Sequence, residues 1–342
     1  MPRFYAVLMT GLSIFASCSL CMAADQSLID AARKEGSVNW HTTQIVNQFA
    51  KPAAELFERK YGIKVDFVRS DPGAIVLRVM GEAKSGRMQA DVFDSAPAVS
   101  ALKAEGLALR WVPDGASRFD KKYVDSEGYW TATNFYVLTP AFNTELVKKG
   151  TEPRTWDDLL DPRWKGKIAW PAQLTTAGAA GFVGLVLTEL GEDKGMAFLH
   201  KLALQNITPM NVTARQVVDQ MIAGEHQVSL QIFNHHPVIS AQLGAPVDWI
   251  PMSPAFEYAS PVAITKGAPH PNAAKLFVEF LVSPEGQALY RDADYMPIDQ
   301  SLPTKVSALR PDGVKFRSIW FTPEAIEAQG ARWMKIYKDV FP

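Results

Sequence analysis

Residues 37–95 read SVNWHTTQIVNQFAKPAAELFERKYGIKVDFVRSDPGAIVLRVMGEAKSGRMQADVFDS, and this stretch decides the fold class. Residues 37–43 and 63–70 have the short apolar–polar pattern of strands, and residues 90–96 are also strand-like. Residues 48–62 between the first two form an amphipathic helical pattern that ends at a glycine, and residues 71–86 form a second helical pattern. Such βαβ alternation predicts an α/β fold with a mostly parallel, helix-covered sheet whose ligand loops follow the carboxyl ends of the strands.

The remaining chain predicts a second lobe of the same kind. Residues 128–143 are rich in β-branched and aromatic side chains, and we expect them to cross between lobes. A new α/β set starts near residue 155, and the strand at residues 256–267 is expected to return to the first lobe. The expected division is a first lobe of residues 24–138 and 260–305, a second lobe of residues 139–259, and a helical tail, 306–342, assigned to neither lobe.

The first 23 residues have the layout of a secretory signal, with a basic residue, an apolar stretch and small residues before a cleavage site near Ala23. The apolar stretch is short for a membrane span, so we expect an exported, periplasmic protein. Both cysteines, Cys18 and Cys21, lie inside this segment, so the mature chain would have no disulfide. A lipid anchor on Cys18 is an alternative, although Phe15 fits the lipid-attachment pattern poorly.

Composition narrows the function classes. The formal net charge is −1 with interspersed charges, which predicts no nucleic-acid partner and no polybasic membrane contact. A hydrophobic content of 47% is ample for two cores, and we expect a monomer. The chain has no nucleophile elbow, no HExxH motif and no cysteine outside the signal, so a periplasmic enzyme is the disfavoured alternative; we predict no catalytic residue, no cofactor and no resident metal.

An ordered set of segments resembles the bacterial extracellular solute-binding proteins of family 1, in the branch that contains ferric-iron, phosphonate and sugar-phosphate binders. The segments are ARKEGSVNWHTT, the E-x-F-x-x-K-Y-G-I-K-V run ending at residue 65, ADVFDSAP, WDDLLDPRWKGKIAWP, MIAGEHQVSLQ and AITKGAPHPNAAKLFVEFLVSPEGQALY. The resemblance implies the type II periplasmic-binding fold, with two lobes, crossing strands and a cleft that closes on a ligand. It also implies docking onto the permease and ATPase subunits of an ABC importer.

Ligand contacts in the first lobe are expected where strands end and helices begin. Free backbone N–H groups and the positive end of a helix dipole favour anions at such positions. An alternative role for these side chains is to cap their own helices. The candidates are Thr42, Thr43, Ser70, Asp71, Gly73 and Ser95, with His41 as a weaker candidate.

The second lobe offers an equivalent set of candidates. Two threonines precede a helix with small residues, where the glycines are expected to serve helix packing, and an aromatic residue on each of two strands could stack on a planar ligand. Arg215 could bind a carboxylate or phosphate, or could be a solvated helix residue. The candidates are Trp170, Thr175, Thr176, Thr213, Asn234, His235 and Tyr258, with Arg215 as a weaker candidate.

Residues 234–236 (Asn-His-His) stand where the resemblance places the metal-binding tyrosines of the ferric members, and the chain has no adjacent tyrosine pair. This departure favours a small organic anion (carboxylate, phosphate or phosphonate) over iron. Ferric iron or another metal remains the alternative, including a site built by the two histidines with His41. We expect residues 235 and 236 to be neighbours in a strand, where side chains point to opposite faces, so both would rarely bind one ion. A thiamine- or polyamine-like cation is the third possibility, since Asp71, Asp94 and Glu257 could supply carboxylates.

Overall fold

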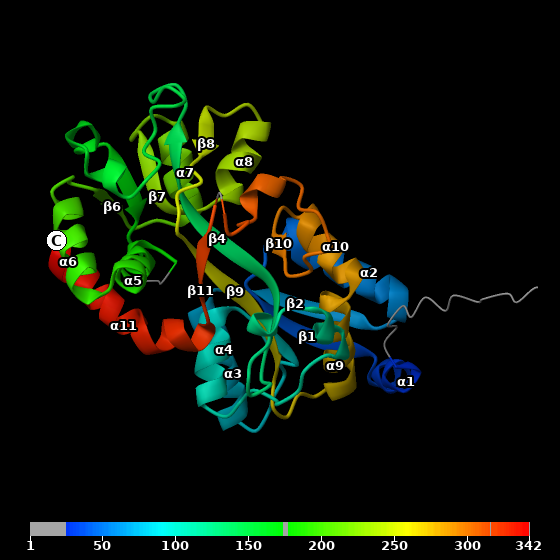
Figure 1. The fold of residues 1–342 in the computed structure, drawn as a ribbon. Helices are drawn as coiled ribbons and strands as arrows, with labels where there is room; N and C mark the ends of the chain where they lie inside the picture. The colour runs from blue at the N-terminus through cyan, green and yellow to red at the C-terminus, as the bar shows by residue number, and fades with distance from the viewer. Residues whose placement is uncertain (1–24, 174–176, 315, 342) are drawn as a thin grey trace, which may run out of the picture.

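The computed structural model describes residues 25–173, 177–314 and 316–341. Its strands form one curled mixed sheet in the order β2-β1-β3-β9-β4-β7-β5-β6, with helices on its faces. The two ends of this sheet belong to two lobes, which are joined in the middle by long strands (Figure 1). The predicted two-lobed α/β fold is confirmed, with the difference that one continuous sheet runs through both lobes.

The first lobe is built on three parallel strands at one end of the sheet. Two amphipathic helices in this lobe, α1 and α2, end at glycines with positive φ, as the sequence predicts. The elements are β1 (Ser37–Thr42), β2 (Lys64–Arg69), β3 (Val92–Asp94), α1 (Gln26–Glu35), α2 (Lys51–Tyr61), α3 (Pro72–Lys84), α4 (Ala96–Ala104), α9 (Pro271–Val282) and α10 (Pro284–Asp292).

The second lobe is built on the parallel strands at the other end of the sheet. Its core surrounds Trp170 and Phe182, which are fully or almost fully buried. The elements are β5 (Ile168–Pro171), β6 (Thr208–Met210), β7 (Val228–Phe233), β8 (Val247–Trp249), α5 (Ala179–Leu190), α6 (Glu192–Ala203), α7 (Ala214–Ile222) and α8 (His235–Gln242).

Two long antiparallel strands, β4 (Thr131–Asn143) and β9 (Ala255–Ile264), connect the lobes. The expected lobe boundaries, at residues 138/139 and 259/260, fall inside these strands, so the division of the chain remains a prediction. Short elements complete the sheet and the loops: strands β10 (Met296–Pro297) and β11 (Ser318–Phe321), a π-helical turn (Val46–Ala50) and 3-10 turns at Asp114–Arg118, Lys121–Tyr123, Asp157–Leu160, Pro162–Trp164 and Ser307–Leu309.

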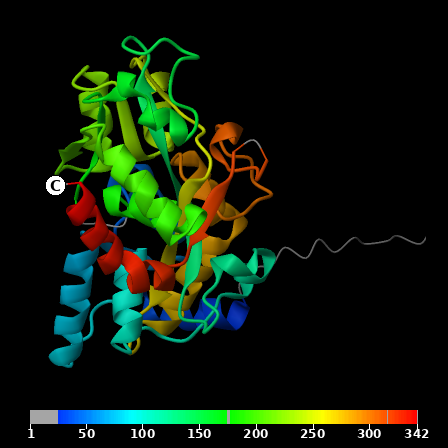
Figure 2. The same ribbon diagram turned by 60° about the vertical axis from the view of Figure 1, so that its left-hand side comes forward.

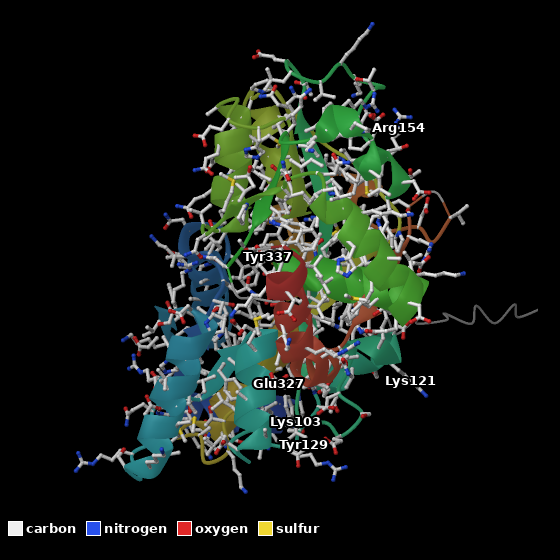
Figure 3. All side chains as sticks on the ribbon, turned by 90° about the vertical axis from the view of Figure 1, so that its left-hand side faces the viewer. Lys103, Lys121, Tyr129, Arg154, Glu327 and Tyr337 are labelled. Atoms are coloured by element: carbon white, nitrogen blue, oxygen red, sulfur yellow. The ribbon has the colours of Figure 1, made fainter. Side chains whose placement is uncertain are left out.

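The C-terminal helix α11 (Pro323–Val340) lies along both lobes. Its second half belongs to the second-lobe core, where Trp333 and Tyr337 pack near α5. Its first turns approach α4 of the first lobe (Figures 2 and 3). The tail that the sequence assigns to neither lobe therefore contacts both.

Residues 235 and 236 differ from the sequence interpretation, which treats them as neighbours in a strand. They form the first turn of α8, whose helical start is favoured by Pro237 in that turn. The two imidazole rings consequently lie on one helix, with their centroids 4.6 Å apart. Within the part of the chain that the structure describes, no helix is both long and apolar enough to cross a membrane.

Candidate functional site

A cavity of about 270 Å³ lies between the lobes, and each part of the fold contributes to its wall. Thr43 and Ser95 come from the ends of first-lobe strands, and Ala177 precedes the first helix of the second lobe. Tyr136 and Tyr258 come from the two crossing strands. We refer to this cavity as the cleft, because it lies at the carboxyl ends of first-lobe strands, where open α/β sheets bind ligands.

Helix α4 begins at the wall of the cleft. Its N-cap residue, Ser95, has φ of 86°, an unusual backbone conformation for a residue other than glycine. The side chain of Ser95 does not cap the helix: its Oγ atom is buried and has no hydrogen-bond partner among the described residues, and Ser95 is 8% exposed. Since first-turn N–H groups have no acceptor within a helix, the start of α4 offers N–H and O–H donors to a ligand.

Helix α5 begins at the same cleft from the second lobe. Its N-cap is Gly178, and the preceding residue, Ala177, lines the cavity. A β-carbon on Gly178 would lie 2.6 Å from the carbonyl oxygen of Pro171, so only glycine lets the chain pass β5 this closely before the helix. The positive ends of two helix dipoles therefore meet at one cavity.

Asp94 organises the loop after β1 from beneath the cleft. Its buried carboxylate accepts hydrogen bonds from Trp40 Nε1 (3.1 Å), from the Thr43 N–H (2.8 Å) and Oγ1 (2.7 Å), and from the Thr42 hydroxyl. Burial raises the pKa of Asp94, and these donors act in the opposite direction. The hydroxyls of the two predicted residues Thr42 and Thr43 therefore both donate hydrogen bonds to Asp94, and Thr43 also lines the cleft.

Three aromatic rings form the floor of the cleft. Tyr136 and Tyr258 are directly paired across β4 and β9, with ring centroids 5.4 Å apart, and Phe233 lies 5.1 Å from Tyr136. Burial raises the pKa of both tyrosines. Their phenols are therefore neutral near pH 7, and present aromatic faces and hydroxyls rather than charges.

A larger groove of about 490 Å³ adjoins the cleft and continues between α3, α4 and α11. The two cavities share Pro72, Ala96, Pro97 and Ile326. The predicted residues Asp71 and Gly73 line this groove and not the cleft itself. Asp71 caps α3 by accepting the Ala74 N–H at 3.0 Å, which is the capping role that the sequence left open.

Several predicted residues line neither cavity. Thr42 and His41 are buried on β1, and Ser70 donates its N–H to the Thr42 carbonyl. Trp170 is fully buried in the second-lobe core, where its ring meets Phe341 with centroids 4.8 Å apart. Thr175 and Thr176 lie outside the described residues.

Thr213 and Arg215 belong to the start of α7. Thr213 and Gln216 form a reciprocal capping box. Arg215 forms an ion pair with Asp219 at 2.6 Å and donates to the His236 carbonyl at 3.3 Å. These contacts occupy both side chains within their own lobe.

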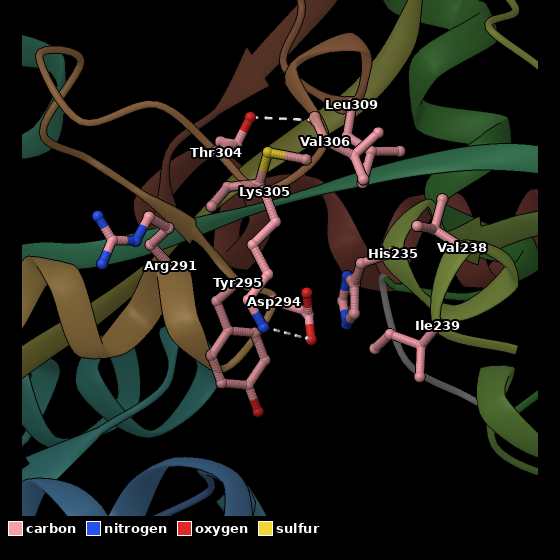
Figure 4. Close-up of a pocket in the computed structure, with 11 residues that line it drawn as sticks. His235, Val238, Ile239, Arg291, Asp294, Tyr295, Thr304, Lys305, Val306 and Leu309 are labelled. Carbon is pink, nitrogen blue, oxygen red and sulfur yellow. Dashed lines mark hydrogen bonds and ion pairs between the residues drawn. The ribbon is translucent and has the colours of Figure 1, made fainter. Parts of the chain in front are cut away.

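Asn234 and His235 lie behind the aromatic floor. Asn234 is buried and its Nδ2 donates to the Leu309 carbonyl at 2.8 Å. His235 lines a separate pocket of about 10 Å³, with Tyr295 and Asp294 nearby (Figure 4). That volume is about enough for one water molecule. Burial lowers the pKa of His235 to about 4, so its ring is neutral near pH 7. Among the described residues, no group of three or more His, Cys, Asp or Glu side chains could hold a metal ion.

The cleft also contains residues that sequence reasoning did not select. Phe233 is recognisable as an aromatic residue at a strand end, but Tyr136 gives no such signal, because only the β4–β9 register places it beside Tyr258. Ile326 reaches the cleft from the C-terminal helix, 229 residues after Pro97 in the sequence (326 − 97). No local pattern predicts that approach.

Comparison with curated proteins gives full-length relatives. A protein of Haemophilus influenzae with no assigned function is 27% identical, and the match covers 96% of each chain. A periplasmic protein of Salmonella paratyphi A, whose name proposes 2-aminoethylphosphonate binding, is 25% identical over 95% of this chain and 96% of that protein.

Solved structures share the fold. The periplasmic binding protein AfuA from Actinobacillus pleuropneumoniae, with bound fructose-6-phosphate, matches with a TM-score of 0.71 and 24% identity, over 89% of this chain and 99% of that chain. The apo ferric ion-binding protein A of Pasteurella haemolytica matches with a TM-score of 0.73 and 20% identity, over 89% and 98% of the two chains. At these identities, the similarity shows the fold and not the ligand.

A protein-family model described as a bacterial extracellular solute-binding protein matches residues 88–319. This match covers most of the chain, and includes both crossing strands and the second lobe. Together with the two-lobed fold and the cavity between the lobes, it shows that the chain belongs to the bacterial extracellular solute-binding proteins.

Proposed function

We propose that this protein captures a small organic anion, a carboxylate, phosphate or phosphonate, in the cleft and delivers it to an ABC importer from the periplasm. The observation that carries the proposal is the meeting of two helix starts at one cavity. Helix α4 brings the Ser95 hydroxyl, which has no partner among the described residues, and α5 begins two residues after Ala177. N–H groups, a hydroxyl and two positive dipole ends are suited to the oxygens of one anionic group.

The relatives support this ligand class. The name of the Salmonella protein proposes phosphonate binding, and AfuA has a bound sugar phosphate. One related chain and one protein of the same fold are therefore both associated with ligands that carry a phosphorus oxyanion. The expected signal over residues 1–23 supports export, and the family supports handover to a membrane permease. Recovery of the protein from the periplasm with Ala24 as its first residue is the expected result of fractionation and mass spectrometry; retention of residues 1–23 contradicts the export proposal.

Ferric iron is the second candidate, favoured by the close approach of Tyr136 and Tyr258 and by ferric-binding proteins with the same fold. Phenolate oxygens suit hard cations. Burial raises the pKa of both tyrosines, however, so metal binding would have to displace protons from both phenols. Neither tyrosine has a described carboxylate beside it in the wall of the cleft.

The test is a thermal-shift panel on the purified protein with inorganic phosphate, ethylphosphonate, benzoate, putrescine and Fe(III). A ligand at a hundredfold its dissociation constant stabilises a protein by about 2.7 kcal/mol, so a true ligand shifts the midpoint measurably. Stabilisation by an anion supports the proposal, whereas stabilisation by putrescine or Fe(III) alone contradicts it. Visible absorption with Fe(III) would identify phenolate ligation.

The variant Ser95→Ala tests whether the anionic group of the ligand lies at the start of α4. This variant removes the unpartnered hydroxyl, and should weaken every anion about tenfold, the worth of one charge-assisted hydrogen bond. Ser100→Ala is the matched control, because Ser100 is on the same helix but faces the adjoining groove. Equal affinity in Ser95→Ala and the wild type would place the anion elsewhere.

A further inference from the structure

Most of the lining of the cleft is apolar. The rings of Tyr136, Phe233 and Tyr258 form the floor and are all partly accessible. Pro72 and Pro97, in the first turns of α3 and α4, also line the cleft. The interplanar angle is 66° between Tyr136 and Phe233 and 41° between Tyr136 and Tyr258, so the three rings form a concave surface rather than a flat stack.

The helix α11 closes the apolar wall. Ile326 from its first turns lines both the cleft and the adjoining groove, and is 7% exposed. The body of a ligand whose anionic group lies at Ser95 is therefore surrounded by aromatic, proline and aliphatic carbon. Such surroundings favour apolar ligand surface, and aromatic rings favour a second ring in edge-to-face or offset contact.

No charged side chain lines the cleft among the residues that the structure describes. Asp94, a carboxylate that is hydrogen-bonded to the cleft residue Thr43, is buried and also accepts hydrogen bonds from Trp40 and Thr42. Asp71 and Glu327 are acidic, but they line the adjoining groove and not the cleft. An ammonium group inside the cleft would lose its water without gaining a carboxylate partner, which is costly.

We infer that the ligand is an anion with an uncharged, apolar and planar body, such as an aryl carboxylate or aryl phosphonate, and not an aminoalkyl phosphonate. This inference rests on the proposed function, because it assumes that the anionic group lies at the start of α4. The cleft, at about 270 Å³, is many times larger than the pocket of about 10 Å³ beside His235, which suits one water molecule. The larger volume suits a single-ring acid such as benzoate or phenylphosphonate.

The test compares phosphonates that share one anionic group. Isothermal titration of the wild type with phenylphosphonate, ethylphosphonate and 2-aminoethylphosphonate varies only the body of the ligand. Phenylphosphonate should bind at least about tenfold more tightly than ethylphosphonate, because its ring buries more apolar surface. 2-Aminoethylphosphonate should bind no more tightly than ethylphosphonate, because its ammonium group has no partner.

Phe233→Ala tests the aromatic floor independently of the anionic group. This variant should weaken phenylphosphonate about tenfold and change the affinity for ethylphosphonate by less than about twofold. Phe233→Leu keeps most of the apolar volume but not the ring, so its affinity for phenylphosphonate should lie between those of the wild type and Phe233→Ala. If Phe233→Ala does not fold, Phe233→Leu is compared with the wild type instead.

The outcomes separate the inference from the proposed function. If ethylphosphonate binds and 2-aminoethylphosphonate binds about tenfold more tightly, the proposed function stands and the inference is wrong. Equal affinity for phenylphosphonate and ethylphosphonate likewise overturns the inference alone. If no phosphonate, phosphate or carboxylate binds at all, the proposed function fails and the inference fails with it.

Discussion

Trp333 of the C-terminal helix packs directly over Gly184 of α5: a β-carbon on Gly184 would lie 2.5 Å from Cδ2 and Cε2 of the indole ring. The ring belongs to the second-lobe core and is 3% exposed. The absence of a side chain at Gly184 is therefore what allows α11 to approach α5. The sequence interpretation of the glycines before and within α5 as packing residues agrees with this contact.

Gly184→Ala should destabilise the protein by about 1–3 kcal/mol, since inserting a methyl group forces the indole or the helix to move. Urea unfolding measures the loss. Gly81→Ala is the matched control, because Gly81 also lies in a helix but has no neighbour within 4 Å of the added carbon. That control should be stabilised by about 0.5–1 kcal/mol through helix propensity. Equal stability of the two variants contradicts the packing argument.

Trp170→Phe should lower the free energy of unfolding by about 1–3 kcal/mol without changing ligand affinity, because the indole fills the second-lobe core and does not line the cleft. Denaturant unfolding and titration with the best-binding anion measure the two effects separately. An affinity loss of about tenfold, with little change in stability, would mean that Trp170 contacts the ligand after all.

Glu324→Ala should destabilise the protein by about 1–2 kcal/mol, because the indole N–H of the buried Trp130 would lose its acceptor at the start of α11. Its carboxylate accepts the indole N–H of Trp130 at 2.8 Å and lies 3.4 Å from the ammonium of Lys103. Glu327→Ala, one turn later, is the control and should change stability by less than about 0.5 kcal/mol, because Glu327 is exposed like Glu324 but makes no hydrogen bond or ion pair among the described residues. The Glu324 contact would be dispensable if both variants unfolded at the same urea concentration.

His235→Phe should reduce the acid sensitivity of the fold. Burial lowers the pKa of His235 to about 4, so the unfolded chain binds more protons than the folded protein between that value and about 6.5. The stability that the neutral ring contributes is present above about pH 6.5 and is lost as the pH falls. Removing the group should make the difference in unfolding free energy between about pH 7.5 and pH 5 smaller by about 2 kcal/mol.

The comparison for this prediction is the pH dependence of the wild type, measured by urea unfolding at both pH values. His235→Leu provides a second variant without a titrating ring, and both variants should show the reduced difference. If the difference in unfolding free energy between the two pH values is the same in both variants as in the wild type, His235 is not the proton-binding group.

The fold class could be predicted from sequence because local patterns carry it. The strand at residues 37–42, the helix ending before Gly62 and the strand at residues 64–69 each have their own periodicity and end signals, so no distant contact is needed to recognise them. The local pattern also predicts a strand at residues 235 and 236, because an apolar run precedes them, and this prediction is wrong: α8 begins there.

The candidate site was only partly predictable. Thr43, Ser95 and Tyr258 line the cleft and follow from strand ends and helix starts, whereas Trp170 has a similar pattern and is buried in the core. Whether a residue at a strand end points into a cavity depends on which elements pack over it, and this packing is set by contacts between distant segments.

Local patterns in the sequence predict the two-lobed α/β class and candidate ligand contacts at the end of the first strand, and the sequence has no adjacent tyrosines. The pairing of Tyr136 with Tyr258 across β4 and β9, and the approach of Ile326 to the cleft from the C-terminal helix, arise only in the folded chain. Helix and strand periodicity depends on residues that are close together in the sequence. The shape and charge of a cavity depend instead on how segments that are far apart in the chain pack together.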